Sequence, residues 1–227
     1  NIIKRIPLVG AALTGFYKRY IDPSTPFSSS EKYWIDRYRE GGNSGDGSYG
    51  KLAEFKAEVI NRFVSEQQIS TIVEFGCGDG NQLEMASYPS YLGFDVSQGA
   101  IDLCKSKFSD DASKDFFLTD EYVDQVAELA MSLDVVFHLV EDDVFGLYMS
   151  RLFESSSKFV IVFSSNTDDN MNEMAEHVKH RHFTKWIDSN QPEWTLLKHL
   201  PNRYPWDGDT KTGSFADFYI FQKSAHG

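Results

Sequence analysis

The sequence contains few cysteines, no long apolar run and little positive charge. Its two cysteines, Cys77 and Cys104, form no C-x-x-C pair. Their scarcity argues against a disulfide scaffold and a structural zinc site, and fits a reducing compartment. The apolar stretch Ile6–Phe16 contains glycine and is too short to span a bilayer. We therefore expect a cytoplasmic protein with no integral membrane segment.

Acidic residues outnumber basic ones. Lys and Arg total 22 against 34 Asp and Glu, which gives a formal net charge of -12, and no Lys/Arg run occurs. Because an acidic surface repels phosphate backbones, we expect no nucleic-acid partner. Hydrophobic residues make up 41% of the 227 residues and include 18 Phe and 11 Tyr. This composition supports one folded domain with a substantial core.

The N-terminal part differs in pattern from the rest of the chain. Residues 1–20 have the spacing of a weakly amphipathic helix, which we expect to pack on the domain; a membrane-surface anchor is the alternative. Gly41–Ser48 is so rich in glycine and small polar residues that we expect no regular structure there. The sequence thus predicts an N-terminal helical segment with a flexible lid loop over residues 1–50. The main domain follows over residues 51–227.

Helix and strand patterns alternate after residue 50. Leu52, Phe55, Val59 and Phe63 fall on one helical face and predict a core-facing helix over residues 50–66. Short apolar runs predict five strands, at Thr71–Phe75, Tyr91–Phe94, Phe116–Leu118, Leu129–Leu133 and Phe159–Phe163. Further helices are expected near residues 98–108 and 141–154.

The end of the chain predicts one more pair of strands. Phe215–Gln222 is rich in aromatic and β-branched residues and is expected to run antiparallel, paired with Trp194–Leu200. Together these patterns predict an α/β, Rossmann-like fold. It has a mostly parallel sheet with helices on both faces and an antiparallel C-terminal strand.

The candidate chemistry is concentrated where the first predicted strand ends, in the turn Gly76-Cys77-Gly78-Asp79-Gly80. A strand followed by a glycine-rich turn and a helix presents a ligand at the carboxyl edge of an α/β sheet. Glycine there lets the backbone turn tightly and approach the ligand. Asp95 ends the next strand about 20 positions later, where a carboxylate accepts hydrogen bonds from ribose hydroxyls.

The residues around this turn discriminate between nucleotide cofactors. A dinucleotide fingerprint requires G-x-G-x-x-G, but its third glycine is replaced by Asn81. Glu74 and Asp79 add negative charge, which opposes a pyrophosphate and suits a ligand that carries an ammonium and a sulfonium. The turn therefore favours S-adenosylmethionine over a nicotinamide dinucleotide. A glycine turn with no ligand is the structural alternative.

Three segments resemble the signatures of class I S-adenosylmethionine-dependent methyltransferases. They are Glu74–Gly80, Gly93–Ser97 and Ser132–Asp142. The similarity covers about residues 50–165, and the chain is also similar to small methyltransferases of sugar or surface-polysaccharide modification. The resemblance implies methyl transfer from S-adenosyl-L-methionine, with the catalytic domain over residues 51–227.

The resemblance also implies roles for individual residues. Gly76, Gly78 and Gly80 would form the cofactor loop, with Glu74 as the strand acid and Asp95 as the ribose-binding acid. Asp120 is positioned like the acceptor of the adenine amino group, with a helix N-cap as an equal alternative, and Ser132 and Leu133 match the strand end beside the cofactor.

In related enzymes an aromatic N-terminal segment folds over the cofactor, which implies a lid with Tyr33, Arg37 as carboxylate ligand, and Ser48 at its edge. Ordinary core aromatics in an amphipathic helix are the alternative.

The histidines are the candidate catalytic residues. A hydroxyl acceptor is a poor nucleophile and benefits from a general base. His138 follows the fourth strand and is the first candidate; His180 and His182 lie after the fifth, near His177. The alternatives are a histidine that stabilises a helix start and a solvated polar face. No spacing is diagnostic of a metal site, so we expect no metal.

The acceptor is expected to be a small molecule or a glycan. Asn202–Trp206 and Ser214–Phe218 are candidates for its pocket, with a surface loop and a core strand as the alternative. The favoured function is O-methylation of a sugar, glycan or small-molecule hydroxyl. The competing functions are a nicotinamide-dependent oxidoreductase and a non-catalytic module that binds S-adenosylmethionine or a protein partner.

Overall fold

The structure is a computed structural model that describes residues 27–170 and 175–224, so the helix predicted over residues 1–20 lies outside the described residues. In the described part, seven strands form one sheet with the order β3-β2-β1-β4-β5-β7-β6. Strands β1 to β5 are mutually parallel, and β7 is antiparallel to β5 and β6. The predicted Rossmann-like α/β fold is confirmed. Among the same residues, no helix is long and apolar enough to cross a membrane.

The strands and helices follow the hydrophobic patterns of the sequence. The strands are β1 Ile72–Phe75, β2 Tyr91–Asp95, β3 Lys114–Leu118, β4 Ala127–Leu133, β5 Ser156–Ser164, β6 Trp194–Leu200 and β7 Asp217–Lys223. The helices are α2 Ser30–Arg39, α3 Gly50–Glu66, α4 Gln98–Lys107, α5 Asp142–Glu154 and α6 Phe183–Asn190. Short 3-10 helices lie at η1 Asp46–Ser48, η2 Gln82–Met85, η3 Thr119–Glu121 and η4 Val136–His138.

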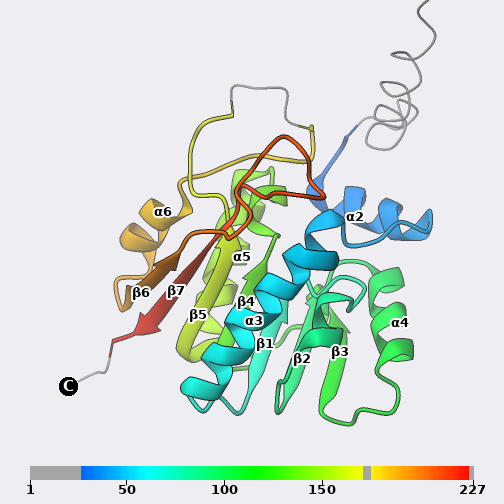
Figure 1. Ribbon diagram of the computed structural model, residues 1–227, viewed down its shortest axis with the longest axis horizontal. Helices are drawn as coiled ribbons and strands as arrows, with labels where there is room; N and C mark the ends of the chain where they lie inside the picture. Colours follow the sequence, from blue (N-terminus) through cyan, green and yellow to red (C-terminus); the bar gives the residue numbers. More distant parts are fainter. Residues whose placement is uncertain (1–26, 171–174, 225–227) are drawn as a thin grey trace, which may run out of the picture.

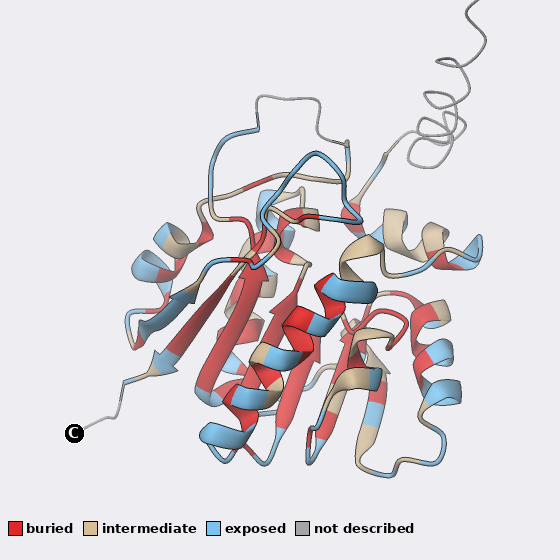
Figure 2. Ribbon diagram, in the orientation of Figure 1, coloured by how far each residue is buried: buried red, intermediate tan, exposed pale blue. Residues whose placement is uncertain are grey.

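Helices cover both faces of the sheet, because alternate strand residues point to opposite sides. Ile72 packs in a cluster with Ile60 of α3 and Ile101 of α4. Its neighbour Val73 packs in a second cluster with Met149 of α5 and Ile187 of α6. Figure 1 shows α3 in front of the sheet and α5 behind it. The central strands between these helices are almost wholly buried (Figure 2).

The connection from β1 to β2 differs from the expected strand–turn–helix unit. After the glycine turn the chain forms only η2 and then an extended stretch before β2. This stretch includes Pro89, whose missing N–H and fixed φ disfavour an α-helix. Instead α3, which precedes β1, contacts η2 and covers this face.

Two elements were not anticipated. The prediction that Gly41–Ser48 holds no regular structure was wrong, because Asp46–Ser48 forms η1. Gly45 before it has φ of 88°, a conformation that favours glycine. Helix α6 was also missed; it is short and buries only Phe183 and Ile187. Helix α2 begins where Ser29 Oγ accepts a hydrogen bond from the Lys32 N–H at 3.1 Å, and lies above the top of the sheet beside α4 (Figure 1).

Candidate functional site

A cavity opens at the carboxyl edge of the sheet. The ends of β1, β2 and β4 contribute Gly76, Asp95 and Leu133 to its lining. Side chains from α2, η1, α3 and α5 complete it, among them Trp34, Tyr38, Ser48, Lys56 and Tyr148. Because the carboxyl edge is where open parallel sheets bind ligands, the cavity occupies the position predicted for the cofactor.

The glycine turn requires glycine at two positions that line this cavity. Gly76 and Gly78 have φ of 85° and 60°, in the region that side chains disfavour. A Cβ on Gly76 would overlap the Val135 side chain, and one on Gly78 would overlap Ser44 Oγ. Close packing of the backbone therefore explains both glycines. Gly80 also has positive φ but lies against Phe108 and is not in the cavity lining.

Asp95 is held rigidly at the end of β2. Its Oδ2 accepts a hydrogen bond from the Gly78 N–H at 3.0 Å and its Oδ1 accepts one from the Ser97 N–H at 2.9 Å. Burial raises the pKa of Asp95 to about 6, and these backbone donors oppose the rise. The carboxyl group is thus fixed beside the glycine turn and faces the cavity.

Glu74 lies within β1 and lines the same cavity as Asp95. Its carboxylate accepts a hydrogen bond from the Tyr91 hydroxyl at 2.7 Å. Burial raises the pKa of Glu74 to about 7, while the Tyr91 bond and the Lys56 ammonium act against the rise. Two carboxyl groups with raised pKa values in one cavity indicate a site that a cationic ligand would stabilise.

Lys56 and Asp134 form an ion pair in the cavity wall that the sequence reasoning did not identify. Lys56 Nζ lies 2.5 Å from Asp134 Oδ2, and the lysine side chain is 1% exposed. Asp134 directly follows β4 and adopts φ of 59°. A signal was present, because Lys56 is four positions from both Leu52 and Ile60 on the apolar face of α3. A lysine at a core position of an amphipathic helix is a candidate functional residue.

The segment from α2 to η1 is bound to the glycine turn by hydrogen bonds. Ser44 N–H donates to Asp79 Oδ2 at 3.0 Å, and Asp79 N–H donates to Ser44 Oγ at 2.9 Å. The Tyr49 hydroxyl donates to the same carboxylate at 2.7 Å, and the Asn81 side-chain amide donates to the Ser48 carbonyl at 2.6 Å. Although burial opposes it, the Tyr49 hydroxyl and the backbone N–H groups of Ser44 and Asn81 lower the pKa of Asp79. Residues 44–49 therefore close one side of the cavity.

Of the three residues assigned to the lid, the structure brings Ser48 to the cavity but not Tyr33 or Arg37. Arg37 donates through Nε to the Asn43 carbonyl at 2.6 Å and through a terminal nitrogen to the Tyr33 hydroxyl at 3.2 Å. The guanidinium thus holds the turn after α2. Tyr33 stacks on His177 with ring centroids 4.0 Å apart.

Two further candidates lie outside the cavity lining. Asp120 is exposed in η3, and its neighbour Thr119 lines the cavity instead. Ser132 is fully buried in β4 and hydrogen-bonds the Tyr148 hydroxyl at 2.7 Å. Because strand residues alternate, Leu133 faces the cavity and Ser132 does not.

Of the three candidate catalytic histidines, His138 lines the cavity. Its Nδ1 lies 3.0 Å from the His177 carbonyl oxygen, which only accepts, so Nδ1 carries the proton and Nε2 is left as an acceptor. Burial lowers the pKa of His138 to about 4, so the ring is neutral at pH 7. Trp34 contacts the ring edge-on, with centroids 5.0 Å apart.

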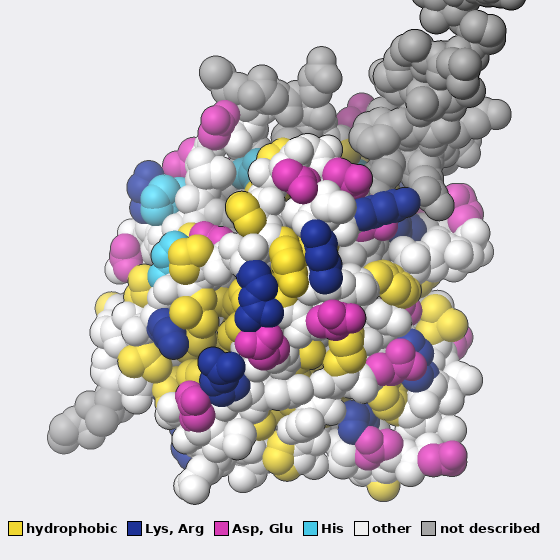
Figure 3. All heavy atoms as spheres, in the orientation of Figure 1, with side chains coloured by type: hydrophobic (Ala, Val, Ile, Leu, Met, Phe, Trp, Pro, Cys, Tyr) yellow, Lys and Arg dark blue, Asp and Glu magenta, His cyan; other side chains and the backbone are white. Residues whose placement is uncertain are grey.

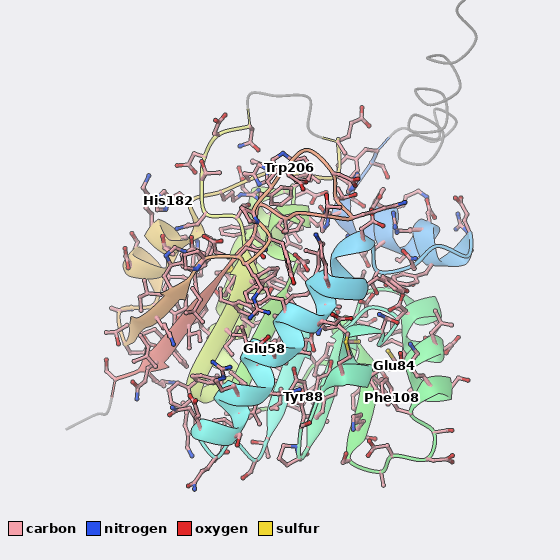
Figure 4. The ribbon with its side chains drawn as sticks, in the orientation of Figure 1. Glu58, Glu84, Tyr88, Phe108, His182 and Trp206 are labelled. Atoms are coloured by element: carbon pink, nitrogen blue, oxygen red, sulfur yellow. The ribbon has the colours of Figure 1, made fainter. Side chains whose placement is uncertain are left out.

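The structure does not bring His180 and His182 into the cavity lining. His180 is buried, with Nδ1 2.6 Å from Ser165 Oγ and its ring against Phe215. His182 lies at the start of α6 and hydrogen-bonds Thr184 Oγ1 at 3.1 Å; Figure 4 shows it away from α3 and α4. Within the described residues, no group of three or more His, Cys, Asp or Glu side chains is arranged to hold a metal ion.

Comparisons with known proteins identify the fold. No protein-family model matches the sequence, and no curated protein matches it. Similar solved structures include the N-methyltransferase NodS from Bradyrhizobium japonicum WM9 in complex with S-adenosyl-L-homocysteine. The TM-score is 0.65 at 12% identity, over 86% of this chain and 99% of that one.

Two further structures are similar over most of their length. Magnesium protoporphyrin IX methyltransferase from Synechocystis PCC 6803 with bound S-adenosylmethionine gives a TM-score of 0.60 at 11% identity, over 88% of this chain and 100% of that one. The methyltransferase domain of bacterial CtHen1-C gives 0.59 at 17% identity, over 75% and 97%. The chain therefore has the Rossmann-like methyltransferase fold.

Proposed function

We propose that the protein is an S-adenosylmethionine-dependent methyltransferase that methylates a hydroxyl group of a small molecule or glycan. The observation that carries this proposal is the cavity at the carboxyl edge, where the glycine turn, Glu74 and Asp95 face one another. The fold adds support, because similar structures were solved with S-adenosylmethionine or its demethylated product.

The residues of the cavity fit this cofactor. Asp95 would accept the ribose hydroxyls, since its carboxylate is fixed beside the glycine turn. Glu74 supplies negative charge that suits a sulfonium and an ammonium. Gln82 Oε1 is buried with no hydrogen-bond partner among the described residues, although the same side chain donates to the Ala53 carbonyl at 3.1 Å. Gln82 lines the cavity, and a ligand N–H would satisfy this oxygen. Thr119, which lines the cavity where Asp120 does not, would lie beside the adenine.

The protein's contribution to methyl transfer is positioning and proton acceptance. When bound, the cofactor supplies an electrophilic methyl group that an in-line nucleophile removes from sulfur. Holding the two reactants in line contributes ~7–11 kcal/mol in well-oriented systems. His138, through Nε2, would accept a hydrogen bond from the acceptor hydroxyl and take its proton as the new C–O bond forms. Residues 44–49 would exclude water from the reacting groups.

The surface favours a small acceptor over a nucleic acid. On the face that carries α3, Lys and Arg side chains are interspersed with Asp and Glu (Figure 3). Arg203, for example, makes two hydrogen bonds to Glu58, at 2.8 and 2.9 Å. Such a mixture of charges attracts a phosphate backbone less than a continuous basic patch would.

The direct test is methyl transfer from isotopically labelled S-adenosylmethionine to fractionated small-molecule and glycan extracts. With a ¹³C-labelled methyl group on the cofactor, we expect a labelled product whose methyl carbon has the NMR chemical shift of an O–CH₃ group and not of an N–CH₃ group. His138→Gln should lower kcat by about 10²–10⁴-fold while cofactor affinity is unchanged. Transfer to nitrogen would contradict the hydroxyl assignment. Tight cofactor binding with no transfer to any fraction would favour a non-catalytic module.

A further inference from the structure

The Lys56–Asp134 pair is the one strongly buried ion pair in the cavity wall among the described residues. Lys56 is 1% exposed and Asp134 is 17% exposed, and both line the cavity. Asp134 is the one hydrogen-bond acceptor that the described residues offer to the Lys56 ammonium, which otherwise lies over the Phe163 ring at 5.4 Å. An ammonium group has three donor hydrogens, so two are left for other partners.

Such a pair is costly unless a ligand completes it. Desolvation of two charges offsets most of their attraction, and apolar residues of similar size often stabilise a core better. A buried lysine with spare donors beside a carboxylate is therefore better suited to binding than to stability. The complementary ligand would carry a carboxylate for Lys56 and an ammonium for Asp134.

The sheet order places this pair where the amino-acid end of the cofactor would lie. Asp95 ends β2 and Asp134 follows β4, with β1 and its glycine turn between them. Two strand spacings separate the two acids by about 10 Å. A ligand whose ribose is held at Asp95 and which extends along the carboxyl edge past the glycine turn would bring its other end to Asp134.

The other basic side chains near the cavity do not fit this role. Arg37, which the sequence suggested, is outside the lining and is engaged by Asn43 and Tyr33. Arg151 lines the cavity from α5, and its guanidinium lies 6.0 Å from the centre of the Tyr122 ring. Tyr122 follows β3, which lies on the opposite side of β1 from β4. Among the described residues, Lys56 is therefore the basic side chain that lines the cavity near β4.

We propose that Lys56 and Asp134 bind the α-carboxylate and α-ammonium groups of the cofactor, with the existing ion pair holding the two side chains in place before the ligand arrives. This assignment rests on the proposed function and identifies the residues that would distinguish the complete cofactor from adenosine derivatives that lack the amino acid.

The test compares two ligands by isothermal titration calorimetry. S-adenosylhomocysteine carries the amino-acid end, and 5′-methylthioadenosine lacks it. Lys56→Met should lower the affinity for S-adenosylhomocysteine by about 10- to 100-fold, the value of a charge-assisted hydrogen bond, and change that for 5′-methylthioadenosine by less than about threefold. Asp134→Asn should likewise lower the affinity for S-adenosylhomocysteine more than the affinity for 5′-methylthioadenosine.

Two variants serve as controls. Arg151→Met removes a positive charge from the other side of the cavity and should change both affinities by the same factor. The double variant Lys56→Met/Asp134→Asn leaves no buried charge unpaired, so it tests the assignment even if Lys56→Met does not fold; circular dichroism checks each protein.

The outcomes separate the two proposals. A parallel loss for both ligands, or no change in their ratio, would overturn the assignment of Lys56 and Asp134 and leave the proposed function standing. Failure of the wild-type protein to bind either ligand would overturn both.

Discussion

Replacing Gly78 with alanine should destabilise the protein and open the segment over the cavity. Gly78 has φ of 60°, where an alanine costs roughly 1–2 kcal/mol. The added Cβ would overlap Ser44 Oγ and lie 3.0 Å from the Tyr38 hydroxyl. Displacement of Ser44 breaks its hydrogen bonds with Asp79 N–H at 2.9 Å and Tyr38 at 2.8 Å. Each contributes about 1 kcal/mol, so we expect a total loss of about 3–4 kcal/mol.

Urea unfolding followed by circular dichroism measures this loss, which corresponds to a Tm lower by roughly 6–16 °C for a chain of this size. Gly146→Ala is the matched control, because Gly146 lies inside α5 and an added Cβ would meet no atom within 4 Å beyond the adjacent backbone of its own helix. It should stabilise the protein by about 0.5–1 kcal/mol. Wild-type stability in Gly78→Ala would refute the close approach between the glycine turn and Ser44.

Three further predictions concern the cofactor site. Because burial raises the pKa of Glu74 to about 7 and of Asp95 to about 6, and a cation favours their ionised forms, S-adenosylmethionine affinity should rise between about pH 5 and pH 8. Below its pKa, each group changes the affinity by at most about tenfold per pH unit. Calorimetry should show that S-adenosylmethionine binding releases protons and that the affinity for adenosine depends less on pH. Equal pH dependence of the two affinities would contradict this coupling. Asp120→Ala should leave cofactor affinity unchanged while Asp95→Ala lowers it at least about tenfold, and a large loss for Asp120 would restore its predicted role. Ser44→Ala should speed amide exchange over residues 40–49, with cofactor slowing it in the wild type; exchange that the cofactor does not alter would remove the lid.

The fold and the cofactor side of the site follow from local sequence patterns. The strand ends that carry Gly76 and Asp95 are adjacent because β1 and β2 pair in parallel, as consecutive strands of a sheet usually do. Asp95 therefore lies beside the glycine turn, at the edge of the sheet that the strand pattern indicates. The missing α-helix after Gly80 shows the limit: the segment up to β2 is short and contains Pro89, and α3 from earlier in the chain covers the exposed face instead.

The remaining parts of the site depend on contacts between distant segments. His180 and His182 lie on the long connection from β5 to α6, whose path is set by bonds such as that from Ser165 to His180. No periodicity encodes that path, so the sequence could not show that these two histidines lie outside the cavity lining. Lys56 was overlooked because a lysine in a helix is ordinarily solvated. Its buried position becomes evident only when Lys56 is placed with Leu52 and Ile60 on the apolar face of the helix.

The proposed function requires that the cavity lined by Glu74 and Asp95 bind S-adenosylmethionine. Calorimetric titration of the purified protein with S-adenosylhomocysteine and, separately, with NAD⁺ tests it most directly. We expect saturable one-to-one binding of S-adenosylhomocysteine, weakened at least about tenfold by Asp95→Ala, and no binding of NAD⁺. Folded protein that binds NAD⁺, or that shows no affinity for S-adenosylhomocysteine, would contradict it.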